Sequence, residues 1–150
     1  MESVLIQEND FQKARKKIRE SKGKKIIFSS GDDELNRKIL EKEDIDVLLL
    51  NLSKRNDRMK QRNSGFNQVL SKIAKKKGRD IGINLDEIIK SNPKEKSDIL
   101  ARIRQNIKLC NKDKLKMKFI SPKGNKRNNH DLKALGLVLG MPTWMTKSLQ

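Results

Sequence analysis

The sequence predicts an α/β fold, a partial TIM-like (βα) barrel of about five βα units, in a single domain over residues 1–150. Short apolar runs alternate about five times with helical segments, which is typical of βα units around a parallel sheet. The run "DVLLLNL" (46–52) is almost entirely apolar, as in strands that are buried on both faces of such a sheet. Right-handed crossovers would curl the strands toward a barrel or an open wound sheet. Five units are too few for an eight-stranded barrel, so we expect an open edge that a partner would have to cover.

The first three predicted elements are a strand, a helix and a strand. "SVLIQ" (3–7) is a short apolar run, as expected of a strand. The segment 9–23 begins with an Asn-Asp pair that suits a helix N-cap, has apolar residues at helical spacing and ends at a glycine. "KKIIFSS" (24–30) is rich in β-branched and aromatic residues, which favour a strand.

The next predicted elements lead into a basic loop. A helix is predicted at 32–43, because the acids in its first turn suit the helix dipole. The buried strand 46–52 follows it. After the loop, the segment 65–77 places Val69 and four other apolar residues on one helical face, and Ser64 is predicted to be its N-cap.

The remaining elements continue the alternation. "RDIGINL" (79–85) predicts a fourth strand, followed by a short helical turn. A longer helix is expected over 93–113, where a proline suits the first turn. "KMKFIS" (116–121) predicts the last strand. A helix at 130–140 ends at a glycine, and a last short helix is expected to begin at Pro142.

The charge of the chain is large and unevenly distributed. The formal net charge is +17, which indicates a polyanionic partner, nucleic acid first and an anionic membrane surface second. Residues 1–51 hold 11 Lys/Arg and 11 Asp/Glu, whereas residues 52–150 hold 25 and 8. Scattered lysines that only improve solubility would not explain this difference. We therefore expect the partner to contact the second two-thirds of the chain.

The composition argues against several classes of site. One cysteine and one histidine cannot build a zinc site, and a lone cysteine suggests a reducing, cytoplasmic compartment. Cys110 is expected in the core, and His130 at a helix start with a surface or capping role. No Gly-rich phosphate loop is present. We therefore expect no catalytic residue, no metal and no cofactor bound by this chain.

Membrane insertion and base stacking are also disfavoured. No apolar run approaches the roughly 20 residues of a membrane span, and no amphipathic helix with large apolar anchors stands out. The chain has four Phe, one Trp and no Tyr, too few to stack bases once the core has taken its share. Binding to the backbone and shape of a folded RNA or a duplex fits better.

Two basic loops follow predicted strands, at 53–63 and 122–129. Functional loops of parallel α/β folds follow the carboxyl ends of the strands, so we expect the two loops to form one cationic surface beside helix N-termini. The RNA-binding residues predicted there are Lys54, Arg55, Arg58, Lys60, Arg62, Asn63, Ser64, Asn67, Lys123, Lys126 and Arg127. The alternatives are solvated loops and, for Ser64, a purely capping role.

The stretch "ILARIRQNIKLC" (99–110) carries polar residues beside an apolar helical stripe. Arg102 and Arg104 fall on either side of the stripe, and Asn106 lies at its edge. Such arginines can cover the core with their stems, pair with acids, or contact RNA or a partner protein. We predict that these three residues bind RNA or a partner.

Four motifs occur in the order that is found in one known family. They are Asp46-Val47-Leu48 followed by Arg62, Ser64-Gly65, Asn67, Val69-Leu70 and Ile81-Gly82; then Arg104, Asn106 and Leu109; then "KFIS"; then "RNNHDLKALGLVLGM". With these motifs the chain resembles archaeal ribonuclease P protein component 3, a relative of the eukaryotic thirty-kilodalton subunit, over about 24–141. Typical members are longer, with extra βα units before the first strand, so this chain resembles a member shortened at its N-terminus. It also departs from the family in having Ser121-Pro122-Lys123-Gly124 where Ser-x-Asp-Ala is common, and Asn129 in place of a proline.

The resemblance implies a barrel related to the polymerase and histidinol phosphatase domains, without their metal ligands. It implies a noncatalytic protein subunit of ribonuclease P, in which the RNA subunit, using magnesium, removes the 5′ leader from precursor tRNA. The implied partners are the ribonuclease P RNA, a second small protein component that pairs with this chain, and precursor tRNA indirectly.

Three other functions are alternatives to this one. Another binder of structured RNA, such as a ribosomal protein or assembly factor, would share the charge asymmetry but not the ordered motifs. A metal-dependent phosphoesterase of the parent barrel class would need carboxylate and His ligands. A membrane-surface protein would need apolar anchors on an amphipathic helix.

Overall fold

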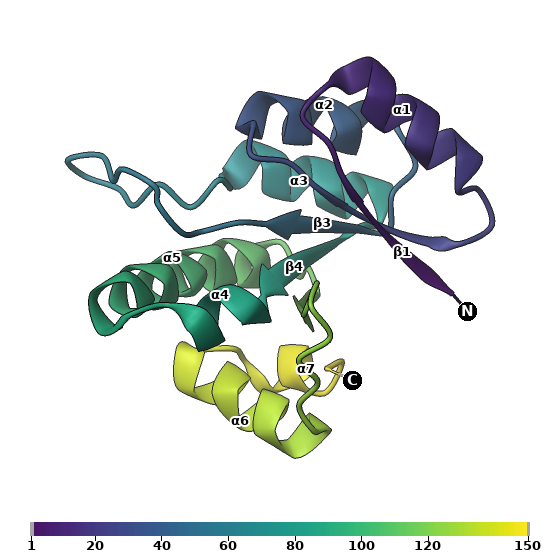
Figure 1. Ribbon diagram of the computed structural model, residues 1–150. Helices are drawn as coiled ribbons and strands as arrows, with labels where there is room; N and C mark the ends of the chain where they lie inside the picture. The colour runs from purple at the N-terminus through teal and green to yellow at the C-terminus, as the bar shows by residue number, and fades with distance from the viewer. Residues whose placement is uncertain (1, 150) are drawn as a thin grey trace.

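Five strands alternate with helices in the computed structural model, which describes residues 2–149 (Figure 1). The strands are β1 (Ser3–Gln7), β2 (Lys25–Ser29), β3 (Val47–Leu50), β4 (Asp80–Asn84) and β5 (Met117–Ile120). The helices are α1 (Phe11–Glu20), α2 (Asp33–Lys42), α3 (Gln68–Lys77), α4 (Leu85–Lys90), α5 (Pro93–Lys112), α6 (Asn129–Leu139) and α7 (Thr143–Thr146). The predicted α/β class and the predicted alternation are confirmed.

The strands form one parallel sheet in the order β1-β2-β3-β4-β5. The register pairs Val4 with Ile26, and it pairs Ile81 with both Leu48 and Met117. Strand order therefore follows chain order throughout, as in a segment of a (βα) barrel, whereas a doubly wound sheet reverses its order at a switch point. The arrangement is consistent with a partial barrel.

The two faces of the sheet bury different apolar clusters. One face, with Phe28, Leu48 and Ile83 among its residues, packs against the helices and forms the main core. The other face holds a small cluster of Ile27, Val47 and Leu49, onto which partly buried apolar residues of β1 and β5 pack. Side chains of successive residues point to opposite faces of a strand, so the continuous apolar run of β3 supplies both clusters.

The helices contact one another in sequence: α1 with α2, α2 with α3, α3 with α5, and α5 with α6. In Figure 1 the helices follow the curve of the sheet, from α1 and α2 at the top of the view to α5 and α6 at the bottom. Within the described residues, no helix combines the length and the apolar character that crossing a bilayer would require.

Cys110 lies in the main core on the inner face of α5, as predicted. Burial, followed by the nearby carboxylate of Asp113, raises the pKa of its thiol far above the ordinary value. The thiol therefore stays protonated and behaves as a small apolar side chain.

Two helix boundaries differ from the prediction. The helix α1 ends at Glu20, before the predicted glycine. The helix α3 begins at Gln68, where Asn67 is the N-cap and its Oδ1 accepts a hydrogen bond from the backbone of Leu70 at 2.9 Å. The predicted capping role of Ser64 is therefore wrong. The physical reason is Gly65, whose φ of +67° cannot continue a right-handed helix.

The inward face predicted for this helix is also partly wrong. Val69 is 50% exposed, whereas Leu70 and Ala74 are buried. The helix starts later than expected, and residue 69 falls on its solvent side.

Candidate nucleic-acid interface

The loop 53–63 leaves β3 with its backbone anchored to two helices. The N–H groups of Leu52 and Ser53 donate to the carboxylate of Glu87 on α4, at 2.8 and 2.9 Å. The N–H of Lys54 donates to Glu95 on α5 at 2.7 Å. These bonds fix the start of the loop, and the Lys54 side chain is left exposed.

Arg102 holds the same loop from below. Its Nη1 and Nη2 donate to the carbonyls of Leu52 and Arg55, both at 2.7 Å, and its Nε donates to Asp57 at 3.2 Å. The pKa of Asp57 is held below its ordinary value, first by the N–H of Asn63 and further by Arg102. Arg102 is 3% exposed, so the contact with RNA or a partner predicted for it does not fit its burial, and its hydrogen bonds position the loop.

Arg55 is bound within the protein as well. Its guanidinium pairs with both carboxylate oxygens of Asp33, at 2.8 and 3.0 Å, and also donates to the carbonyl of Asn51 and to Asn63. The side chain is 11% exposed. Gly65 lies against it, because a Cβ at Gly65 would stand 2.6 Å from Nη2. The prediction that Arg55 contacts RNA is corrected to a role in holding the two ends of the loop together.

Ser64 and Asn106 are also buried. The side chain of Asn106 donates to the carbonyl of Ser64 at 3.3 Å, and Gln105 donates to the hydroxyl of Ser64 at 3.0 Å and to the carbonyl of Arg62 at 2.9 Å. The contacts with RNA or a partner predicted for Ser64 and Asn106 do not fit this burial. These residues attach the end of the loop to α5.

The remaining cations of the loop face solvent together with cations of α5. A hollow of about 620 Å³ lies between the loop and the helix, and the cations that line it are Arg58, Lys60, Arg62, Arg104 and Lys108. Arg62 pairs with Asp57 at 3.1 Å and with Asp98 at 3.6 Å. Within residues 2–149, the other four cations form no ion pair. We call this hollow and its five cations the α5 groove.

The other side of the loop carries a smaller hollow of about 220 Å³. Arg58, Arg62, Asn63 and Asn67 line it. Asn67 is exposed, although its Oδ1 is engaged in capping α3, and the Oδ1 of Asn63 accepts from Arg55. The structure therefore brings the predicted residues Arg58 and Arg62 to both sides of the loop.

The second basic loop is anchored to the neighbouring acid of α4. Asp86 accepts hydrogen bonds from the hydroxyl of Ser121, from the N–H of Lys123 at 2.9 Å and from the side chain of Asn125 at 2.8 Å. Burial alone would raise the pKa of Asp86, but these hydrogen bonds outweigh burial and hold the pKa below its ordinary value. The predicted residues Lys123, Lys126 and Arg127 remain exposed.

The two loops do not merge into one surface. In Figure 1 the loop after β3 projects to the left, beyond the sheet, whereas the loop after β5 lies below the sheet and leads into α6. The expected single cationic surface is corrected to two patches, which are connected through the consecutive acids of α4.

The carboxyl edge of the sheet carries a row of neutral polar side chains between these patches. Asn51 donates to the hydroxyl of Ser29 at 2.9 Å, and Asn84 donates to the Oδ1 of Asn51 at 3.0 Å. Barrel enzymes place catalytic groups at such strand ends. Hydroxyl and amide groups form hydrogen bonds here but do not ionise near neutral pH. Within residues 2–149, no group of three His, Cys, Asp or Glu side chains is placed to hold a metal ion.

Similarity to known proteins agrees with the resemblance seen in the motifs. The chain is 30% identical to ribonuclease P protein component 3 of Methanococcus maripaludis over 105 residues. The aligned residues cover 70% of this chain and 42% of the relative. It is 32% identical to ribonuclease P protein component 3 of Methanosarcina acetivorans over 87 residues, and these residues cover 58% of this chain and 34% of the relative. This chain is a homologue of ribonuclease P protein component 3. The match spans less than half the length of these curated relatives, and no family model matches the chain.

A solved structure shares the fold. One chain of the cryo-EM structure of archaeal ribonuclease P with mature tRNA superposes with a TM-score of 0.77, covering 97% of this chain and 62% of that chain at 23% identity. At this identity the similarity shows the fold, which this homologue of component 3 preserves over nearly all of its length.

Sequence reasoning missed the residues that hold the two basic loops in place. Asp33, Asp86, Glu87 and Glu95 bind loop backbone or loop side chains from other elements, and no local pattern marks them. Lys108 in the α5 groove was also missed, although it lies one helical turn after Arg104, on the same face.

Replacing Gly65 with valine should destabilise the protein more than the same change at Gly124. Both glycines have positive φ, at +67° and +77°, which costs a branched residue about 1–2 kcal/mol. At Gly65 the side chain would also meet Arg55, which cannot move without breaking its bonds to Asp33 and Asn51, whereas nothing lies within 4 Å at Gly124. We expect a further loss of about 1–3 kcal/mol for Gly65→Val in urea unfolding. Equal losses in the two variants would contradict the proposed contact.

Asp86→Asn should remove a stabilising contribution that depends on pH. Because the folded-state pKa of Asp86 is depressed, its contribution is present at neutral pH and is lost as the pH falls through and below about 4. We expect the gap in unfolding free energy between the parent protein and the variant to be wide at pH 7 and to narrow on acidification. Asp44→Asn is the control, because Asp44 is 95% exposed and pairs only at the surface. A gap that does not change with pH would contradict this role.

Proposed function

We propose that this chain is a noncatalytic protein subunit of ribonuclease P that binds and stabilises the catalytic RNA that removes the 5′ leader from precursor tRNA. The observation that carries the proposal is the α5 groove, where five cations line one hollow and four of them have no acid partner within residues 2–149. Homology to component 3 supports the choice of RNA.

The α5 groove is suited to the phosphate backbone of a folded RNA. Arg58, Lys60 and Arg104 lie on two elements whose relative position is fixed by Arg102 and Gln105, so their charges converge without a large loss of conformational freedom. Neutralising phosphates releases counterions and lowers the repulsion between RNA helices. In this proposal magnesium is used by the RNA, no cofactor is bound by the protein, and precursor tRNA is contacted only through the RNA.

We also propose that the sheet is a segment of a TIM-like barrel related to the polymerase and histidinol phosphatase domains. The consecutive strand order and the contacts between successive helices support this relation. The hydrogen-bonded row of Ser29, Asn51 and Asn84 lies at the strand ends, where a catalytic relative would carry metal ligands.

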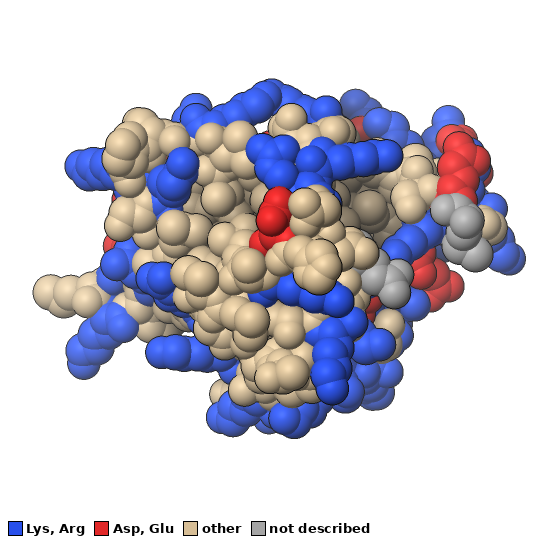
Figure 2. All heavy atoms as spheres, turned by 90° about the horizontal axis from the view of Figure 1, so that it is seen from below, with Lys and Arg blue, Asp and Glu red and all other residues tan. Residues whose placement is uncertain are grey.

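The second small protein component is proposed to pair with this chain at α6. Leu137 and Val138 of α6 are 55% and 72% exposed, and an RNA backbone offers nothing apolar to cover them. Figure 2 shows that on the face seen from below uncharged surface alternates with Lys and Arg, some of them near the middle of the view. A protein that offers both apolar and acidic side chains would complement this face.

Replacing Arg58, Lys60 and Arg104 with glutamine should weaken binding of in vitro transcribed archaeal ribonuclease P RNA. We expect the log–log salt dependence of the affinity to become shallower by about 2–3, because each lost phosphate contact contributes about 0.7–0.9. Filter binding over a range of salt concentrations measures both quantities. The fold should be unchanged, because none of the three side chains forms an ion pair within residues 2–149.

The matched control for this experiment replaces Lys72, Lys76 and Lys77 of α3 with glutamine, which removes the same charge from the solvent side of another helix. If the groove variant bound the RNA as tightly as the parent at moderate salt, the groove would not be the binding site. If the parent itself did not bind this RNA, the proposed function would be wrong.

Replacing Leu137 and Val138 with serine should weaken association with the second small protein component in sedimentation velocity. The reason is the loss of exposed apolar area at the centre of the proposed contact. Val69→Ser is the control, because Val69 is half exposed on α3. Association that is unchanged in the α6 variant, or reduced equally in the control, would argue against docking at α6.

A further inference from the structure

A second concentration of positive charge lies on α1 and on the turn that leads into β2. Residues 13–25 hold eight Lys/Arg and one acid, Glu20, whereas the other ten acids of residues 1–51 lie outside this segment. The net charge of residues 1–51 is therefore zero, although residues 13–25 alone are strongly basic. In Figure 1 this segment lies at the right of the molecule, away from the loop after β3 at the left.

The acids near this segment neutralise only part of it. Glu43 is shared by Arg15 and Arg19, at 3.8 and 3.4 Å, and Lys17 pairs with Glu8 at 2.9 Å. Within residues 2–149, the exposed ammonium groups of Lys13, Lys16 and Lys22 form no ion pair. Lys13 and Lys16 are three positions apart on one face of α1, so their charges lie on the same solvent-facing side.

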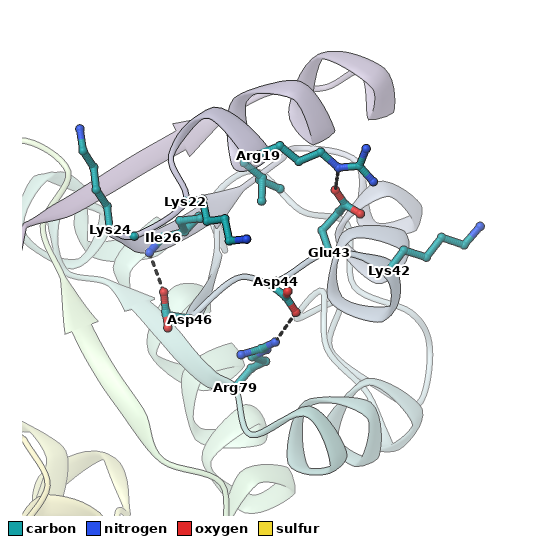
Figure 3. Close-up of a pocket in the computed structure, with 11 residues that line it drawn as sticks. Arg19, Lys22, Lys24, Ile26, Lys42, Glu43, Asp44, Asp46 and Arg79 are labelled. Atoms are coloured by element: carbon teal, nitrogen blue, oxygen red, sulfur yellow. Dashed lines mark hydrogen bonds and ion pairs between the residues drawn. The ribbon is translucent and has the colours of Figure 1, made fainter.

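The surface beside these lysines is hollowed. A hollow of about 540 Å³ at the amino end of the sheet is lined by residues of α1, of α2 and of the turns before β2, β3 and β4. A shallow hollow of about 420 Å³ lies on the outer side of α1. Figure 3 shows Lys22 extending across the first hollow, whereas Lys24 and Lys42 point away from it on opposite sides.

The three acids of the first hollow are already engaged by the protein itself. Glu43 pairs with Arg19, Asp44 pairs with Arg79 at 2.9 Å, and Asp46 accepts the N–H of Ile26 at 2.7 Å (Figure 3). The unpaired charge at the rim is therefore positive.

We propose that the outer face of α1 and the following turn form a second phosphate-binding surface, which contacts another segment of the same RNA at the amino end of the sheet. The proposal rests on the proposed function and extends it from one contact to two. The exposed Lys13 and Lys16 lie along α1 and Lys22 lies on the turn that follows it, so the charges are spread over the surface and suit a nucleic-acid backbone better than a small anion.

The test replaces Lys13, Lys16 and Lys22 with glutamine and compares this α1 variant with the parent, with the α3 control at Lys72, Lys76 and Lys77, and with the groove variant. Filter binding to in vitro transcribed archaeal ribonuclease P RNA is measured from low to moderate salt, and urea unfolding checks that each variant is folded. We expect the α1 variant to bind more weakly than the α3 control, with a log–log salt slope shallower than the parent's by about 2–3.

The outcomes separate this inference from the proposed function. If the groove variant lost affinity while the α1 variant bound like the α3 control, the second surface would be disproved and the proposed function would stand. If the α1 and α3 variants lost affinity equally, net charge alone would explain the effect and the second surface would again be disproved. If the parent did not bind this RNA at all, the proposed function would fail as well.

Discussion

The carboxylates of Asp86 and Glu87, which are consecutive residues in the first turn of α4, hold the loops that follow β3 and β5. Glu87 accepts two backbone N–H groups at the start of the loop after β3, and Asp86 accepts the N–H of Lys123 and the side chain of Asn125 in the loop after β5. Each loop is rich in Lys and Arg, so each has a negative charge at its base. The position is favourable for the acids too, because the N-terminal end of a helix stabilises negative charge. Without this pair, like charges within each loop would repel more strongly, and each loop would lose hydrogen bonds that fix it relative to the sheet. The position of the cations at the carboxyl edge of the sheet thus depends on two acidic residues.

The sequence was sufficient to predict the alternation of strands and helices, because apolar periodicity and helix caps are local signals. It also identified the loop cations, since charge can be counted without coordinates. It could not separate cations that face solvent from cations that hold the protein together. Arg55 and Arg58 look equivalent in the sequence, but Asp33, which is distant in the sequence, binds Arg55 and not Arg58.

The same limit explains why Ser64, Asn106 and Arg102 were expected to contact RNA or a partner. Their burial follows from the way the loop folds down onto α5, and that path depends on the positive φ of Gly65. The distribution of charge in the first third of the chain shows the reverse error. A sum over residues 1–51 is neutral, yet within residues 2–149 the exposed Lys13, Lys16 and Lys22 of α1 and the following turn form no ion pair. Net charge over a stretch of sequence is therefore a poor guide to the potential at any one face.

The buried guanidinium of Arg102 has a thermodynamic consequence for recognition. Ordering one residue of a flexible loop costs about 1–2 kcal/mol of conformational entropy, a cost that a disordered basic segment meets when it binds. Arg102 donates to two loop carbonyls and to Asp57, so much of that ordering is completed when the protein folds. Association would then proceed close to rigid docking, with a rate governed by long-range electrostatic attraction and little affected by folding of the loop. By ordering the loop in advance, Arg102 would in this way increase the rate at which the exposed cations of the loop bind a partner.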